Sequence, residues 1–167
     1  MSLENLQLPA IIIGDLYKKC IVNIEPVLQL TTTSVPVQIN FLGGNASHIT
    51  LIVDQPNATY IADDELSFLT GILTACNLTI GDIALINLNK RPAINYKDIS
   101  AELMSETIIL FGVLPEKISL PLHFPPFQIQ RYNEQRYLQV PGLAILKEDR
   151  ELKKQLWIAL KTLFSIP

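Results

Sequence analysis

The pattern of apolar and polar residues changes near residue 48. Prolines and the run Thr31–Ser34 interrupt the first 47 residues repeatedly, and their apolar runs are short. From His48 onward, compact apolar runs alternate with amphipathic stretches. We therefore expect an irregular N-terminal arm over residues 1–47 and a single folded domain over residues 48–167.

Four short apolar runs in the second part predict buried strands. They are Ile49–Val53, Ile83–Asn87, Thr107–Phe111 and Gly142–Leu146. Each is apolar along most of its length, which is typical of parallel strands that are covered on both faces.

Amphipathic stretches between these runs predict helices. One begins at Asp63 or Asp64 and ends near Asn77, a shorter one covers Asp98–Met104, and the last covers Asp149–Phe164. Pro115–Ile118 predicts a single helical turn, whereas residues 120–137 show no clear period. The alternation predicts an α/β fold with three α/β/α layers around a four-stranded parallel sheet.

Composition narrows the classes of function. Only 17% of the 167 residues are charged and the net charge is −3, so a strongly basic nucleic-acid-binding surface is not expected. No leader peptide and no apolar stretch of membrane-spanning length is visible, and the two cysteines, Cys20 and Cys76, are expected to be reduced and buried. These features predict a cytoplasmic protein without membrane contact, and no residue pattern indicates a metal site or a cofactor.

The carboxyl ends of parallel strands form the usual ligand crevice of such sheets. The predicted strands place Asp54, Gln55, Asn87 and Gly112 there. Asp54 could take a proton from water, or could simply form a turn. Asn87 could read the edge of a base with its amide, or could bond to loop backbone.

Two further groups of residues are candidates for contact with a partner. Lys90 and Arg91, with Arg131 and Arg136, could form a phosphate-facing patch; Tyr132 and Tyr137 could add base stacking. Ordinary solvated charge is the alternative. The aromatic residues Phe124 and Phe127 flank two prolines and could form a docking surface or a lid over the sheet. Trp157 is expected to anchor the last helix in the core.

Several stretches of the domain resemble the uracil-DNA glycosylase superfamily. The most specific is Leu78–Asn87, similar to the family's strand that ends in asparagine, and Glu106–Gly112 is similar to its strand that ends in glycine. The resemblance implies the family's fold. Two departures stand out: the loop Val53–Asn57 lacks the family's glycines, and Ala144–Asp149 lacks its histidine. The resemblance thus implies a glycosylase-like fold without its catalytic motifs.

The order and spacing of the segments also resemble the psi subunits of bacterial DNA polymerase III. The resemblance rests on His48–Val53, the acidic helix start at Asp63–Glu65, the stretch Leu78–Leu88 and the final helix around Trp157, together with an irregular N-terminal third. It implies a non-catalytic interaction subunit that contacts the clamp loader or another replisome protein and touches nucleic acid weakly. The alternative is a divergent uracil-DNA glycosylase or nucleotide-binding enzyme that uses the strand-end pocket.

Overall fold

A computed structural model describes residues 38–90 and 94–166, all of which fall in the unit Pro36–Pro167. Most of the predicted arm, residues 1–37, lies outside the described residues, as do Arg91 and Cys20. The last residues of the predicted arm belong to the fold, because Leu42 and Gly43 form β1, the first strand of the sheet described below.

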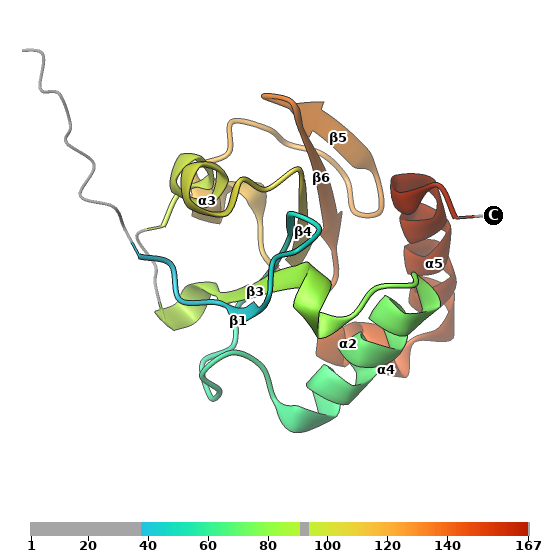
Figure 1. Ribbon diagram of the computed structural model, residues 1–167. Coiled ribbons are helices and arrows are strands. Elements are labelled where there is room, and N and C mark those ends of the chain that lie inside the picture. The colour runs from blue at the N-terminus through green and yellow to red at the C-terminus, as the bar shows by residue number, and fades with distance from the viewer. Residues whose placement is uncertain (1–37, 91–93, 167) are drawn as a thin grey trace, which may run out of the picture. The chain divides into compact units, whose positions relative to one another are not determined.

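The described residues form one six-stranded mixed sheet, whose strands follow the order β1-β3-β2-β4-β6-β5 (Figure 1). The strands after β1 (Leu42–Gly43) are β2 (Ile49–Val53), β3 (Ile83–Asn87), β4 (Thr107–Phe111), β5 (Ile129–Tyr132) and β6 (Gln135–Val140). The four central strands are parallel to one another. The edge strands β1 and β5 are antiparallel to their neighbours.

The prediction of a four-stranded parallel sheet is therefore wrong, because the sheet has six strands and is mixed. Three of the predicted strands are confirmed with the predicted bounds. All five residues of β2, of β3 and of β4 are buried, as expected for strands covered on both faces. The two antiparallel edge strands escaped the prediction because one has only two residues and the other is polar at Gln130 and Arg131.

The fourth predicted strand is a helix. Residues Leu143–Glu148 form α4, in which Leu143 and Leu146 are buried while Ile145 is 58% exposed. This three-residue spacing of buried positions suits a helix, and a short apolar run cannot distinguish it from a buried strand. The fourth parallel strand is instead β6, in the segment without clear period.

The remaining helices are close to their predicted positions. They are α2 (Asp63–Ala75), α3 (Tyr96–Leu103) and α5 (Arg150–Phe164), and the predicted single turn is the 3₁₀ helix η3 (Pro115–Ile118). Asp149 caps α5 with its side chain, and Asn95 caps α3 in a capping box with Asp98. The residue before α2 is Ala62, so neither Asp63 nor Asp64 is its cap; both lie in its first turn, where acidic residues favour the helix dipole.

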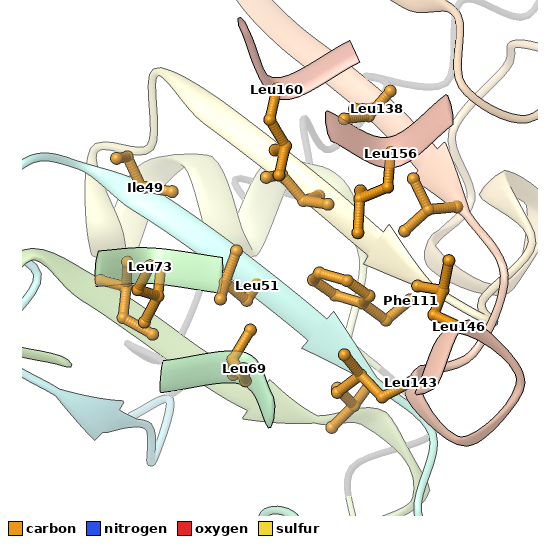
Figure 2. Close-up of a cluster of buried hydrophobic side chains, with 14 of the residues drawn as sticks. Ile49, Leu51, Leu69, Leu73, Phe111, Leu138, Leu143, Leu146, Leu156 and Leu160 are labelled. Atoms are coloured by element: carbon orange, nitrogen blue, oxygen red, sulfur yellow. The ribbon is translucent and has the colours of Figure 1, made fainter. Parts of the chain in front are cut away.

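Two hydrophobic cores cover the two faces of the sheet. On one face, the odd-numbered residues of β2 and β4 pack against helices α2, α4 and α5, and Figure 2 shows Leu51 and Phe111 among Leu69, Leu143 and Leu156. On the other face, Ile52 and Ile108 pack with α3 and η3. The alternation of side chains along each strand thus feeds both cores and produces the three layers.

The order of the parallel strands creates a crevice at the carboxyl ends of β2 and β4. From β2 the chain runs through α2 to β3, and from β3 it runs through α3, on the opposite face, to β4 on the other side of β2. After β4 the chain runs to η3 (Pro115–Ile118), on the same face as α3, whereas the chain after β2 runs to α2 on the opposite face, so these two loops leave the sheet in opposite directions. Doubly wound sheets bind ligands at such a switch point.

Candidate functional site

The switch-point crevice holds an ion pair between the loops after β2 and β4. The Lys117 ammonium, on η3, donates a short hydrogen bond to Asp54 Oδ2. Asn89 Nδ2, in the 3₁₀ helix η2 (Leu88–Lys90) after β3, donates to Asp54 Oδ1 at 3.2 Å. With Leu88, these three residues line a cavity of about 380 Å³.

Both contacts of Asp54 favour its charged form. The hydrogen bond from Lys117, together with the weaker one from Asn89, lowers the pKa of Asp54 below its ordinary value despite partial burial. A carboxylate with a lowered pKa is a weak base, because general-base catalysis works best when the pKa lies near the working pH. This geometry suits a carboxylate that holds a cation or hydrogen-bond donor better than one that removes a proton from water.

The side-chain amide of Asn87 is used to hold the loop after β2. Asn87 is 3% exposed, and its Nδ2 donates to the carbonyl oxygens of Gln55 (2.7 Å), Ala58 (2.9 Å) and Thr59 (3.3 Å). Its Oδ1 accepts from the backbone N–H groups of Gln55 at 3.0 Å and Asn89 at 3.1 Å. Of the two roles open to Asn87, the geometry is that of bonding to loop backbone.

Gln55 joins the same loop to helix α2. Its Nε2 donates to Glu65 Oε2 at 2.6 Å, and Glu65 is only 7% exposed. Burial is the main reason that the pKa of Glu65 is raised, with the neighbouring Asp64 adding to the shift. Gln55 therefore has a structural role, in which its half-buried side chain connects the loop after β2 to α2.

Gly112 permits a close approach of two backbone segments at the end of β4. Its φ is +67°, and its N–H donates to the carbonyl of Val140 at 2.8 Å. A Cβ at Gly112 would lie 3.0 Å from Cα of Gly142, which precedes α4. Glycine is needed here for both the left-handed conformation and the contact.

The four predicted pocket residues thus lie together at the carboxyl ends of the parallel strands, but they have different roles. Asp54 faces the cavity, whereas Asn87, Gln55 and Gly112 stabilise the loops that surround it. Lys117 was not predicted as a site residue. It lies in the predicted turn Pro115–Ile118, and the sequence does not indicate that this turn lies next to the carboxyl ends of the strands.

The predicted basic patch is not assembled among the described residues. Lys90 follows β3 at the carboxyl edge of the parallel strands, where its ammonium donates to the Pro56 carbonyl at 3.1 Å. Arg131 lies on β5, directly opposite Arg136 near the beginning of β6, at the other edge. Since β6 runs parallel to β3, these charges lie at opposite ends of the sheet.

The predicted aromatic surfaces are also divided between the two faces. Phe124 is 9% exposed and belongs to the core beside α3, whereas Phe127 packs against the core beneath α5. Tyr132 contacts the edge of the Tyr96 ring, with centroids 5.8 Å apart. Tyr137 is fully buried, so it cannot stack on a base, and burial raises its pKa to about 12.

An apolar groove between α2 and α5 was missed. It has a volume of about 430 Å³, and its lining includes Phe68, Gly71 and Ile72 of α2 and Leu156, Trp157 and Leu160 of α5. Trp157 is 37% exposed, so its predicted role as a core anchor is wrong. The helical stripe that carries Leu156 and Leu160 indicated the core face of α5, but the sequence could not show that a groove remains between α5 and α2.

No protein-family model matches the chain, and no curated protein matches it either. Within residues 38–90 and 94–166, no helix is long and apolar enough to cross a membrane.

Proposed function

We propose that this domain is a non-catalytic protein-interaction module, an accessory subunit similar to psi that binds the clamp loader or another replisome protein. The observation that carries the proposal is the apolar groove between α2 and α5, with Trp157 on its wall. Binding hot spots of protein interfaces are enriched in tryptophan, tyrosine and arginine.

The form of the groove suggests the kind of segment that occupies it. It extends from Ser67 to Ala75 on α2 and from Lys153 to Leu160 on α5, or about 10–12 Å at 1.5 Å per residue. The small residues Gly71 and Ala75 leave room along one wall. These dimensions suit about two turns of an amphipathic helix laid into the groove.

Charge beside the groove favours an acidic partner. Lys153 lines the groove, with its ammonium 5.6 Å from the centre of the Phe68 ring, and Lys161 lies one turn beyond Trp157 on α5. The α2 residues that line the groove carry no charge. We therefore propose that the partner helix carries acidic residues next to its apolar anchors.

The contacts in the crevice at the strand ends support a non-catalytic role of this domain. The Asp54 carboxylate is paired with Lys117, and the Asn87 amide is occupied by loop backbone. The two histidines of the chain lie elsewhere: His48 contacts Leu103 and His123 pairs with Glu116 at 3.0 Å. The identity of the partner as a clamp-loader subunit rests on the resemblance to psi subunits.

A binding measurement with purified components tests this proposal. The full chain is titrated against the clamp-loader complex of its own organism, and Trp157→Ala is compared with wild type. Loss of a hot-spot tryptophan costs about 2 kcal/mol or more, so we expect the dissociation constant to rise about 30-fold. Lys153→Glu should weaken binding as well, by a smaller factor that shrinks as salt is added.

Leu114→Ala provides the matched control. Leu114 is 51% exposed, so this variant truncates an exposed apolar side chain away from the groove. It should bind as wild type does. Equal weakening by both variants, or no binding of the wild-type chain to any clamp-loader subunit, would refute the proposal.

The cavity at Asp54 favours a second candidate, a divergent uracil-DNA glycosylase or a nucleotide-binding enzyme. The cavity lies at the switch point where related sheets bind ligands, and it offers a carboxylate, an amide and an ammonium within one site. The test is uracil release from single-stranded DNA by the wild type and by Asp54→Asn. Release that depends on Asp54 would favour the enzyme, and a flat time course at high enzyme concentration would dispose of it.

A further inference from the structure

Strand β5 leaves a backbone edge open. No other strand of the described residues pairs with its outer side. The Arg136 N–H donates to the Glu106 carbonyl at 2.9 Å, toward β4, so Arg131 and Arg136 form a non-hydrogen-bonded pair of the antiparallel β5–β6 ladder. The backbone groups of Arg131, and of Ile129 two residues before it, therefore point away from β6.

A groove lies directly beside this edge. It has a volume of about 590 Å³ and is lined by Phe127 and Ile129 on one side and by Gln155, Ile158 and Thr162 of α5 on the other. Ile158 is 65% exposed, so it adds apolar surface to the wall of this groove. Side chains of a strand added to β5 would enter this groove at every second residue.

Two arginines give the edge a charge. Arg131 and Arg136 face one another across the ladder, on the side of the sheet where Arg136 donates to the Leu163 carbonyl of α5 at 2.8 Å. Like charges directly opposite each other destabilise a strand pair. Among the described residues neither arginine forms an ion pair, although Glu106 and Glu134 line the same cavity of about 690 Å³.

We propose that β5 is a docking edge for an extended segment of a partner protein, which adds a strand antiparallel to β5. In that segment an acidic residue lies opposite Arg131, and an apolar residue two positions later lies opposite Ile129 and enters the groove beside Ile158. This edge is separate from the groove between α2 and α5, and the inference does not depend on the proposed function.

Charge argues against a second copy of this chain as the occupant. An antiparallel pair of β5 strands would bring two copies of Arg131 and two of Arg136 together. Such an arrangement multiplies the like-charge contacts that already exist in one chain. An acidic segment instead supplies the carboxylate that both arginines lack.

The test uses synthetic peptides and the full chain labelled with ¹⁵N. The probe is the capped peptide TTETITT, whose glutamate and isoleucine have the required order and spacing. We expect it to slow hydrogen exchange and shift the amide resonances at Ile129 and Arg131, since those N–H groups gain partners. The same peptide methylated on the isoleucine nitrogen loses one ladder hydrogen bond and should not bind.

Charge reversal tests the recognition of the acidic residue. A cross-strand ion pair is worth up to about 1 kcal/mol, so Arg131→Glu should weaken TTETITT by about threefold to fivefold and should prefer TTKTITT. Arg150→Glu, an exposed charge in the first turn of α5, is the matched control and should leave both affinities unchanged.

Three results would overturn the inference. One is the absence of any change at Ile129 and Arg131 up to millimolar peptide. Another is equal binding of TTETITT and TTKTITT to the wild-type chain. The third is a concentration-dependent shift of the β5 resonances without peptide, which would show that a second copy covers the edge.

Discussion

Asn87 holds the loop after β2 through a single buried amide, and its two N–H donors serve three backbone carbonyls. Asn87→Asp would remove these donors and place a carboxylate against the same oxygens. Because a buried group without its partners costs its full desolvation penalty, we expect the free energy of unfolding at pH 7 to fall by about 3 kcal/mol. Urea denaturation measures this loss.

The pH dependence of that loss identifies its cause. Burial raises the pKa of the new carboxyl group, so the deficit should shrink as the pH falls toward about 4, where the group is protonated and can donate again. Asn57→Asp is the control, because Asn57 lies in the same loop but is exposed. A deficit of equal size in the two variants would show that the contacts of Asn87 contribute little.

Glu65 is a buried acid whose ionisation opposes folding. Burial raises its pKa in the folded protein, so the folded state binds this proton more tightly than the unfolded chain. Its contribution therefore favours folding at low pH and becomes unfavourable as the pH rises above the ordinary pKa of glutamate, about 4.3. Glu65→Gln should raise the melting temperature at pH 7, and the gain should vanish toward pH 3.5.

The hydrogen bond from Gln55 can persist in this variant, because the glutamine carbonyl oxygen is also an acceptor. Glu102→Gln, an exposed change on α3, should leave the melting temperature unaltered across the same pH range. A melting temperature of Glu65→Gln below that of the wild type at pH 7 would contradict this account.

For single residues, the sequence predicted which side chains lie near one another but not the hydrogen bonds that they form. Asp54 follows one buried strand and Asn87 ends another, so the prediction that both lie at the carboxyl ends of the strands followed from the apolar runs. The partners of Asn87 are backbone carbonyls 28–32 residues upstream, and no side-chain pattern encodes them. Lys117 was missed for the same reason, since it is 63 residues from Asp54.

The hairpin of β5 and β6 carries strain that a substitution can relieve. Its turn residues Asn133 and Glu134 have φ of 50° and 64°, the left-handed values of a type I′ turn. Asparagine adopts this conformation at little cost, whereas glutamate adopts it at a cost of about 1–2 kcal/mol. Glu134→Gly should raise the free energy of unfolding by about 0.5–1 kcal/mol, the strain relieved less the entropy that glycine loses on folding.

The control is the same substitution in a helix. Glu102→Gly on α3 should lower the stability by about 1 kcal/mol, because glycine is a poor helix former. Chemical denaturation of the two variants gives both values. Destabilisation by Glu134→Gly would mean that the glutamate side chain contributes more than its backbone conformation costs.

The elements that were predicted correctly have strong periodicity, and those that were missed do not. Of the apolar stripe of α5, Leu156, Ala159, Leu160 and Leu163 are buried, whereas Leu152 is half-buried. Strand β6 was not predicted because Gln135, one of its buried residues, is polar. Its side chain donates to the Ser100 hydroxyl at 2.8 Å and accepts from the Tyr137 hydroxyl at 2.6 Å. A strand whose core positions include a hydrogen-bonded glutamine has no apolar signature.

At the scale of the whole molecule, both cores depend on one sheet. Successive residues of β2 and β4 enter opposite cores, so neither layer of helices can be removed without exposing strand residues. The α/β character was predicted correctly because alternating strands and helices permit few arrangements, whereas the number of strands and the all-parallel sheet were not. The edge strands were not, since their pairing depends on contacts that a local pattern does not record.

The two cores also predict what happens when the first 37 residues are deleted. Within residues 38–90 and 94–166, six strands form one sheet with a buried core on each face, so a chain that begins at Gln38 is expected to fold. Circular dichroism and urea denaturation should show a single cooperative transition with the denaturant sensitivity of a domain of this size. Failure to fold would show that the two cores are not sufficient.

The folded fragment then separates two sources of partner binding. The resemblance to psi subunits predicts that the N-terminal arm contributes to the contact with the clamp loader, so the fragment should bind it more weakly than the full chain. If the fragment retains the affinity of the full chain and loses it on Trp157→Ala, the groove between α2 and α5 is the contact and the arm has no part in it. If the fragment loses all binding while remaining folded, the arm is required and the groove alone does not suffice.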